Sequence, residues 1–239
     1  SAQSTIAHGY CESNETDYVE NHEIKAKLIK IETLHRSLNP FDDMRTFLAL
    51  RRVIKEVKPD LVNTHTSKAG VLGRIAAKSI DRSMPVVHTY HGHLIYGYFA
   101  KYKKITFTLI ERLLAQFTNA AVSITKETQT SLQKLKIGKN LEWSVIHLGI
   151  PVSSNSFLPL NDGNKLRLLW VGRFTDIKDP AYAVKVMMEL EKISPNKFEL
   201  SMVGGGELLD QIKKSAQNLP IRFFGWMDKP FENSGHFDL

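Results

Sequence analysis

Short apolar runs alternate along the chain with longer segments in which apolar residues recur every three or four positions. The short runs have the length of buried strands, and the longer segments have the spacing of amphipathic helices. Pro, Gly, Asn and Asp residues stand between them, as expected for turns. The pattern predicts strands at 4–11, 26–31, 60–65, 85–91, 119–125, 143–150, 166–171, 198–203 and 221–226. It predicts helices at 42–57, 67–80, 101–117, 126–135, from 181 onward and from about 207 onward.

This alternation of strands and helices predicts an α/β protein with parallel, doubly wound sheets. The periodicity is lost at residues 151–164, where Pro, Ser, Asn and Gly collect, so we interpret this segment as an interdomain linker. The sequence therefore predicts two Rossmann-like units, at 1–150 and 165–239. A chain of 239 residues is long enough for two small domains, each with its own core.

The apolar stripes predict how two of the helices pack. Asp42 or Asp43 is the predicted N-cap of helix 42–57, and Ser67 is the predicted N-cap of the next helix. The stripe of helix 101–117 is expected to pack on the sheet, with contact to a bilayer as the alternative. That stripe consists of Ile105, Leu109, Leu113 and Phe117. The inner face of helix 42–57 is predicted to consist of Met44, Phe47, Leu48, Leu50, Val53, Ile54 and Val57.

The composition is that of an ordinary folded protein, with 42% hydrophobic and 24% charged residues. No apolar run is long enough to predict a membrane span, and the first residues do not resemble a signal peptide. Cys11 is the single cysteine and cannot form an intrachain disulfide, which indicates a reducing cytosol. The net charge of +7 would attract phosphorylated ligands, anionic lipid or nucleic acid. No basic block, zinc-finger spacing or RNA-binding aromatic signature favours nucleic acid.

Two cations follow the predicted strand 166–171. Arg173 comes directly after Gly172, and Lys178 follows five residues later. In open α/β sheets, ligands bind beyond the carboxyl ends of the strands. A planar guanidinium and a compact ammonium at that position suit a diphosphate. The alternative is an Arg and a Lys on a solvated loop.

A second glycine-rich turn follows strand 198–203, with Gly204, Gly205 and Gly206 before the next helix. The backbone amides of such a turn could bind phosphate. A tight strand-to-helix turn explains the glycines equally well, and no GK[ST] follows as in a P-loop.

Histidines gather at the end of the fourth predicted strand. Alternation along the strand would place His91 and His93 on one side and His88 on the other. An imidazole at the strand tip could hydrogen-bond a sugar hydroxyl, and the alternative is an ordinary surface or core position. Zinc held by these three residues, joined by His65, is a further hypothesis. Because no Cys or carboxylate lies near them in the sequence, we expect no metal.

Three stretches carry a family resemblance. KPDLVNTHTSKAGVLGRIAAKSI resembles the pattern "kPDivHtHtskaGvlgRlAA", and PVVHTYHGHLIYGYF resembles "vvHtyHGHvf.gyf". VGRFTDIKD resembles the VGR-x4-K signature of a second domain. From about residue 25 to 226 the chain is thus similar to bacterial family 4 glycosyltransferases that build surface polysaccharides, within the retaining branch of the GT-B fold. Asn63 stands where the pattern has its first His.

The resemblance implies two Rossmann-like domains facing a cleft, with an acceptor-side domain at 1–150 and the start of a nucleotide-sugar-binding domain at 165–239. The substrates implied are a nucleotide-sugar donor and a saccharide or polyprenyl-linked acceptor, and no metal, other cofactor or nucleic acid is expected. The implied location is the cytoplasm, with peripheral contact at the inner face of the membrane left open. The residues implied are His91 beside the donor sugar as the catalytic-site residue, Arg173 and Lys178 on the donor diphosphate, and His93, Gly204 and Gly205 as weaker candidates for sugar or phosphate contacts.

Elements typical of the family are not found in the chain. These are a first strand with a Gly-Gly loop and helix before Ser4, and a pair of glutamates beyond Leu239. We therefore expect both sheets to be incomplete and the chain to be a poor catalyst by itself. Two other functions stay open, namely a nucleotide-sugar epimerase of the same fold and a non-catalytic fragment that binds sugar nucleotides. The sequence identifies neither the sugar, the base nor the acceptor.

Overall fold

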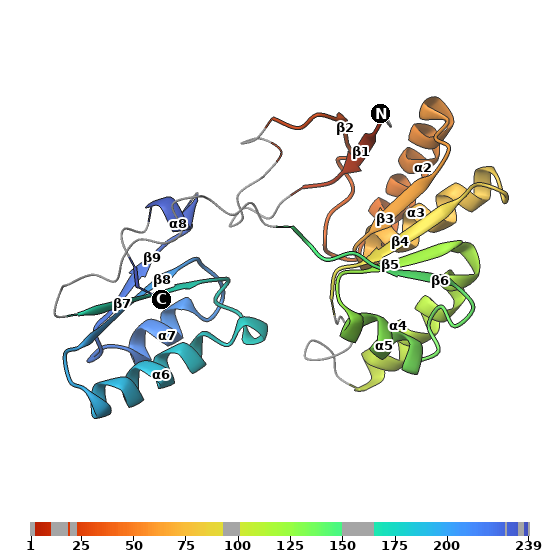
Figure 1. The fold of residues 1–239 in the computed structure, drawn as a ribbon. Coiled ribbons are helices and arrows are strands. Elements are labelled where there is room, and N and C mark those ends of the chain that lie inside the picture. Colours follow the sequence, from red (N-terminus) through yellow and green to blue (C-terminus); the bar gives the residue numbers. More distant parts are fainter. Residues whose placement is uncertain are drawn as a thin grey trace. The chain divides into compact units, whose positions relative to one another are not determined.

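The computed structural model describes residues 3–10, 19, 23–92, 101–149, 165–227, 229–233 and 237–238. The chain forms two compact units, Ser1–Ile150 and Pro151–Leu239. The predicted linker at 151–164 lies outside the described residues. All strand pairs described in both units are parallel, which confirms the predicted α/β class (Figure 1). Among the residues described, no helix is both long and apolar enough to cross a membrane.

The first unit contains a four-stranded sheet and a separate pair of strands. The sheet has the order β3 (Val62–His65), β4 (Val86–Tyr90), β5 (Ala120–Ser123) and β6 (Glu142–Val145). The pair consists of β1 (Thr5–His8) and β2 (Lys27–Lys30). The helices are α2 (Pro40–Val57), α3 (Ser67–Ile80), α4 (Lys101–Leu114) and α5 (Lys126–Lys134), with a 3-10 turn η1 (Ala115–Phe117).

The N-caps of α2 and α3 differ from the predicted ones. Asn39 caps α2, because its side chain accepts hydrogen bonds from the amides of Phe41 and Asp42. The predicted caps Asp42 and Asp43 lie instead in the first turn, where the positive end of the helix dipole stabilises a carboxylate. Ser67 is already the first residue of α3 and does not cap it.

The inner face of α2 is predicted only in part. Phe47, Leu50 and Ile54 pack in a cluster with α3 and β4, as predicted. Met44 and Leu48 face solvent, so their predicted burial is wrong. A helix that packs on one side only buries a narrow stripe of its surface. Met44 and Leu48 lie outside the buried stripe of α2.

A buried ion pair joins α3 to α4. The guanidinium of Arg74 donates to both carboxylate oxygens of Glu111 at 2.9 and 3.1 Å, and both side chains are fully buried. The Tyr90 hydroxyl donates to Glu111 at 2.9 Å, and the Arg74 Nε donates to the carbonyl of Gly70. Burial, with Glu111 as a further cause, raises the pKa of Tyr90 above its ordinary value. The three polar groups therefore satisfy one another, as buried polar groups require.

This ion pair reverses the predicted orientation of α4. The helix buries Thr108, Glu111 and Leu114 and turns its apolar stripe outward. Ile105, Leu109, Leu113 and Phe117 are 41–62% exposed, so the prediction that they pack on the sheet is wrong. A buried Arg74 leaves α4 no alternative, because an unpaired guanidinium in the core would be far more costly than exposed leucines.

The described residues of the second unit form one sheet and one apolar core. The sheet order is β7 (Leu166–Val171), β8 (Phe198–Val203) and β9 (Ile221–Phe224). The helical elements are η2 (Asp176–Lys178), α6 (Pro180–Ile193), α7 (Leu209–Ser215) and α8 (Pro230–Asn233). The core consists of Phe174, Val184, Met187, Leu200, Met202, Ile212 and Ala216. The bounds of β7 and β8 agree with the predicted ones, and α6 begins one residue before its predicted start.

Candidate functional site

Two histidines meet at the carboxyl ends of β3 and β4. His65 is the last residue of β3, and His91 follows the last residue of β4. Their rings share a hydrogen bond of 2.8 Å between Nδ1 of His65 and Nε2 of His91. Both side chains are exposed, and burial together with the neighbouring His91 lowers the pKa of His65. The neutral form of His65 is therefore favoured, and the hydrogen bond holds the two rings against each other.

The turn after His65 is strained. Thr66 has φ 60° and ψ 169°, and a β-branched residue seldom adopts positive φ. The helix α3 begins directly after it, so the positive end of its dipole lies beside the histidine pair. Such backbone outliers cluster at functional sites, which is a reason to place a site here.

His88 has a different environment from the exposed pair. Its ring is buried, hydrogen-bonded to Thr64 Oγ1 at 2.8 Å and in edge contact with Tyr90. Burial, with Arg74 as a second cause, lowers the pKa of His88 to about 3. A Cβ on Gly70 would lie 2.5 Å from its Cε1, so α3 can pack here only with glycine at that position. His88 is thus a neutral core residue.

The metal hypothesis does not gain support from this geometry. In the part of the chain that the structure describes, no group of three or more His, Cys, Asp or Glu side chains could hold a metal ion. His88 is bonded to a threonine, and His93 lies outside the described residues. The sequence predicted His65 only as a fourth zinc ligand, so its pairing with His91 was not predicted. The pairing depends on the parallel register of β3 and β4, which aligns His65 with Thr89 and which no pattern in the sequence defines.

In the second unit, Arg173 lies on the turn that follows the carboxyl end of β7. Backbone hydrogen bonds join this turn to the glycine turn 204–206, which follows β8. The Phe174 amide donates to the carbonyl of Gly205 at 2.9 Å, and the Gly172 amide donates to Val203 at 3.0 Å. Arg173 and the glycine turn are therefore neighbours at the carboxyl ends of β7 and β8. A ligand phosphate beyond these strand ends would meet both.

The glycines of this turn are required by the packing. Gly204 has φ 130°, and a Cβ there would lie 2.0 Å from the carbonyl oxygen of Gly172. Its amide already donates to the carbonyls of Phe224 and Gly225. A Cβ on Gly205 would lie 2.7 Å from the indole nitrogen of Trp226. For Gly204 in particular, these contacts favour the tight-turn interpretation over a phosphate contact.

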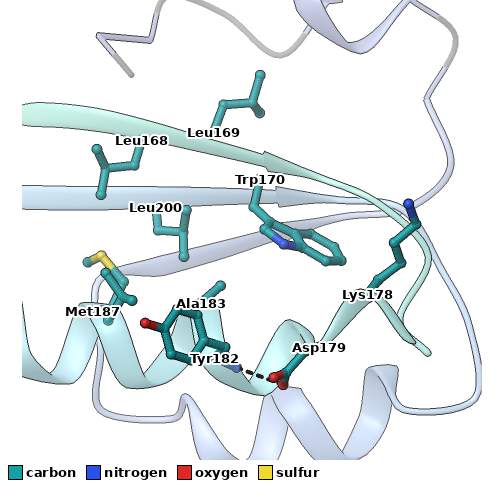
Figure 2. Close-up of a pocket in the computed structure, with 10 residues that line it drawn as sticks. Leu168, Leu169, Trp170, Lys178, Asp179, Tyr182, Ala183, Met187 and Leu200 are labelled. Carbon is teal, nitrogen blue, oxygen red and sulfur yellow. Dashed lines mark hydrogen bonds between the residues drawn. The ribbon is translucent and has the colours of Figure 1, made fainter. Parts of the chain in front are cut away.

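Lys178 is exposed and ends the short 3-10 turn η2, just before α6. Asp179 follows in the left-handed region and caps α6 by accepting from the Tyr182 amide at 3.1 Å. The pocket of about 350 Å³ beside Lys178 is walled mainly by Leu168, Trp170, Tyr182 and other apolar side chains between β7 and α6 (Figure 2). Because a diphosphate needs cations and amides, we place the candidate site at the strand ends rather than in this pocket.

Open parallel α/β sheets with polar side chains at the strand ends form a broad class of ligand-binding proteins. Within that class, residues 8–154 match the family described as Glycosyltransferase Family 4. The chain belongs to this family, which confirms the resemblance drawn from its sequence.

Two curated relatives agree with this assignment, and a solved structure shares the fold. The UDP-Gal:alpha-D-GlcNAc-diphosphoundecaprenol alpha-1,3-galactosyltransferase of Escherichia coli is 30% identical over 231 residues, covering 88% of this chain and 58% of that protein. The O-antigen biosynthesis glycosyltransferase WbnH of Escherichia coli is 24% identical, covering 84% of this chain and 56% of that protein. The sucrose-phosphate synthase of Thermosynechococcus elongatus shares the fold, with a TM-score of 0.66 at 16% identity over 95% of this chain and 61% of that one. The chain spans somewhat more than half the length of the two curated relatives.

Proposed function

We propose that the chain is part of a glycosyltransferase that moves a sugar from a uridine diphosphate sugar to a lipid-linked saccharide during synthesis of a bacterial surface polysaccharide. The family match carries the proposal. The name of the galactosyltransferase relative, which includes a UDP-sugar and a diphosphoundecaprenol-linked acceptor, supports the choice of substrates. We place the protein in the cytoplasm, at the inner face of the membrane.

In the proposed reaction, an acceptor hydroxyl oxygen bonds to the anomeric carbon of the donor sugar. The bond from that carbon to the diphosphate breaks, and the hydroxyl proton passes to the departing phosphate oxygen. We propose attack from the face that the diphosphate leaves, which retains the anomeric configuration. No cofactor or metal is assigned to this step, and the protein contributes fixed charges and orientation.

Arg173 and Lys178 are the proposed ligands of the diphosphate. Negative charge grows on this group as the bond to the sugar breaks, so cations beside it stabilise the transition state more than the ground state. The position of Arg173 at the carboxyl end of β7 supports its role. Lys178 lies five residues further on, at the end of η2 and the start of α6.

His91 is the proposed contact for a hydroxyl of the donor sugar. A neutral imidazole can donate with one nitrogen and accept with the other, and the hydrogen bond with His65 occupies Nε2 of His91, which leaves Nδ1 for the sugar. His65 is therefore proposed as a positioning residue for His91.

Calorimetric titration with uridine diphosphate tests the donor site without requiring turnover. Arg173→Ala should weaken binding by about 1.5–3 kcal/mol, since it removes a charge-assisted hydrogen bond to an anion. Lys185→Ala is the matched control, because Lys185 is an exposed cation on α6 of the same unit. Unchanged affinity in Arg173→Ala would remove this residue from the site.

Product analysis distinguishes the proposal from its two alternatives. A radiolabelled donor that passes its sugar to a lipid-linked acceptor supports transfer, whereas an epimerised nucleotide-sugar would support the epimerase alternative. Slow transfer is sufficient support, because the chain is expected to be a poor catalyst by itself, whereas binding with no detectable product after long incubation would favour a non-catalytic fragment. Membership of the glycosyltransferase family favours the first outcome.

A further inference from the structure

His91 stands at the point where the pairing of β4 ends. Tyr90 is the last paired residue of the strand, opposite Ser123 of β5. His91 follows it, and Gly92 comes next with φ 153°. Apart from its neighbours in the sequence, no described residue has an atom within 4 Å of the place that a Cβ on Gly92 would occupy. Glycine adopts many backbone conformations, so the position of His91 depends on the residue before it.

Three side chains hold that of Tyr90 in place. Its ring stacks on Trp143 at 5.5 Å between centroids and meets the His88 ring edge-on at 4.4 Å. Its hydroxyl donates to Glu111 at 2.9 Å, and Glu111 is held in turn by the guanidinium of Arg74. A buried polar network whose members are all bonded is rigid. The Tyr90 side chain therefore fixes the backbone at the end of β4.

The two faces of β4 have different partners. Tyr90 lies on the face toward α4, whereas Thr89 lies on the opposite one, because side chains alternate along a strand. On that opposite face the Thr89 hydroxyl donates to Asn63 at 3.1 Å, and His91 pairs with His65. Both of these contacts join β4 to β3. The backbone of Tyr90 and His91 is thus the connection between the buried network and the proposed sugar contact.

Packing alone does not require the Tyr90 hydroxyl. Phenylalanine at this position would fill the same space and stack on Trp143 in the same way. Both oxygens of Glu111 would stay bonded to Arg74, so no buried charge would lose its partner. The hydroxyl therefore adds a directional link to a core that is already satisfied. Such links select one conformation where apolar packing alone permits several.

We infer that Tyr90 is a positioning residue, held by Glu111 and Arg74, which sets the orientation of the His91 ring. This role rests on the sugar contact proposed for His91, since only a ring that meets a ligand needs so fixed a direction. Hydrogen bonds weaken steeply as their angle departs from linear, and a catalytic site tolerates errors of about 0.5 Å. A small rotation at Tyr90 would turn Nδ1 of His91 away from its ligand.

Nitrogen NMR of the histidine rings tests the inference on the chain itself. In protein labelled with ¹⁵N-histidine, two-bond correlations show which ring nitrogen carries the proton and which accepts a hydrogen bond. The variants His65→Gln and His91→Gln assign the signals of the pair. Tyr90→Phe should shift the signals of both rings toward the averaged values of a histidine whose two tautomers exchange. The signals of the exposed His147 should stay unchanged.

Ile54→Val is the matched control for a general loss of stability. Ile54 is buried in a different apolar cluster from Tyr90. Both variants should lower protection against hydrogen exchange in the first unit by about tenfold at most. Only Tyr90→Phe should move the signals of His65 and His91. Unchanged signals in Tyr90→Phe would overturn the inference, as would an equal change in Ile54→Val.

A second variant keeps the test decisive should Tyr90→Phe fold poorly. Arg74→Met combined with Glu111→Leu removes the acceptor of the hydroxyl and leaves Tyr90 itself in place. It should move the same two sets of signals, and unchanged signals in the folded double variant would also overturn the inference. If His91→Ala leaves sugar transfer by the enzyme unaffected, the proposed sugar contact fails, while the NMR result still decides whether Tyr90 orients the ring. Uridine diphosphate binding at Arg173 enters neither outcome.

Discussion

In the first unit, α3 and α4 meet through a buried ion pair, whereas in the second unit α6 meets its sheet through aliphatic and aromatic side chains. Arg74 and Glu111 are among the largest fully buried side chains of the first unit, and Phe174, Met187 and Met202 are among those of the second. The apolar core of the first unit is correspondingly divided into separate clusters, while that of the second is continuous. A continuous apolar core tolerates apolar substitutions that keep its volume. A core that contains a buried charge depends on the one side chain that carries the opposite charge.

The ion pair is the place where this difference is largest. Glu111→Leu should destabilise the first unit by about 3–5 kcal/mol, because it leaves the Arg74 guanidinium buried without its partner. Hydrogen exchange followed by mass spectrometry would show faster exchange in α3 and β4. Peptides from β7 and β8 should keep their wild-type protection.

Two further variants sharpen this test. Adding Arg74→Met to Glu111→Leu should restore much of the lost stability, since the pair is then replaced by apolar groups. Glu189→Leu breaks the exposed pair with Lys192 and should change stability by at most about 1 kcal/mol. If Glu111→Leu alone is as stable as the wild type, the first unit does not depend on its buried charge.

The second unit should respond to loss of volume. Met202→Ala removes a fully buried side chain from the continuous core and should cost about 2–5 kcal/mol. The faster exchange should be confined to β7, β8 and β9. Met188→Ala on α6 is the matched control, because Met188 is 44% exposed. Equal loss of protection in β3 and β4 would contradict independent cores.

The same contrast explains how much of the fold could be predicted from the sequence. In the second unit, apolar periodicity places β7, β8 and the start of α6 to within a residue, because burial there follows hydrophobicity. In the first unit, the same periodicity predicts the strands and helices but assigns the wrong face of α4 to the core. No periodicity reveals that Glu111 will meet Arg74, 37 positions earlier in the chain.

The candidate site divides in a similar way. The positions of Arg173 and His91 at strand ends follow from the predicted strands, because strand 85–91 is predicted to end at His91 and Arg173 lies two residues beyond strand 166–171. The contact between His65 and His91 depends on the register of two parallel strands, which local patterns leave undefined. The need for glycine at position 70 likewise cannot be predicted from local patterns, because it arises only where α3 packs against the His88 ring.

The smallest of the three effects is a dependence on pH that α3 and β4 of the first unit should show. The pKa of folded His88 is about 3, against an ordinary value of 6.5. Above pH 6.5 the ring is neutral in both states and its burial contributes fully to stability. As the pH falls, the unfolded chain takes up the proton first, so stability is lost between pH 6.5 and about 3. Between pH 7 and 5 the loss should be about 2 kcal/mol, with the lowered pKa of His65 adding in the same direction.

Hydrogen exchange between pH 7 and 5, corrected for the intrinsic rates, would separate this effect from a general response to acid. Most carboxylates stay ionised in that window, so the histidines dominate. The described residues of the second unit contain no histidine, and β7 and β8 should therefore keep constant protection. His88→Gln should flatten the pH dependence of α3 and β4, although it lowers their stability at pH 7. A steep pH dependence that survives in His88→Gln, or one that β7 shares, would show that proton uptake at His88 is not its source.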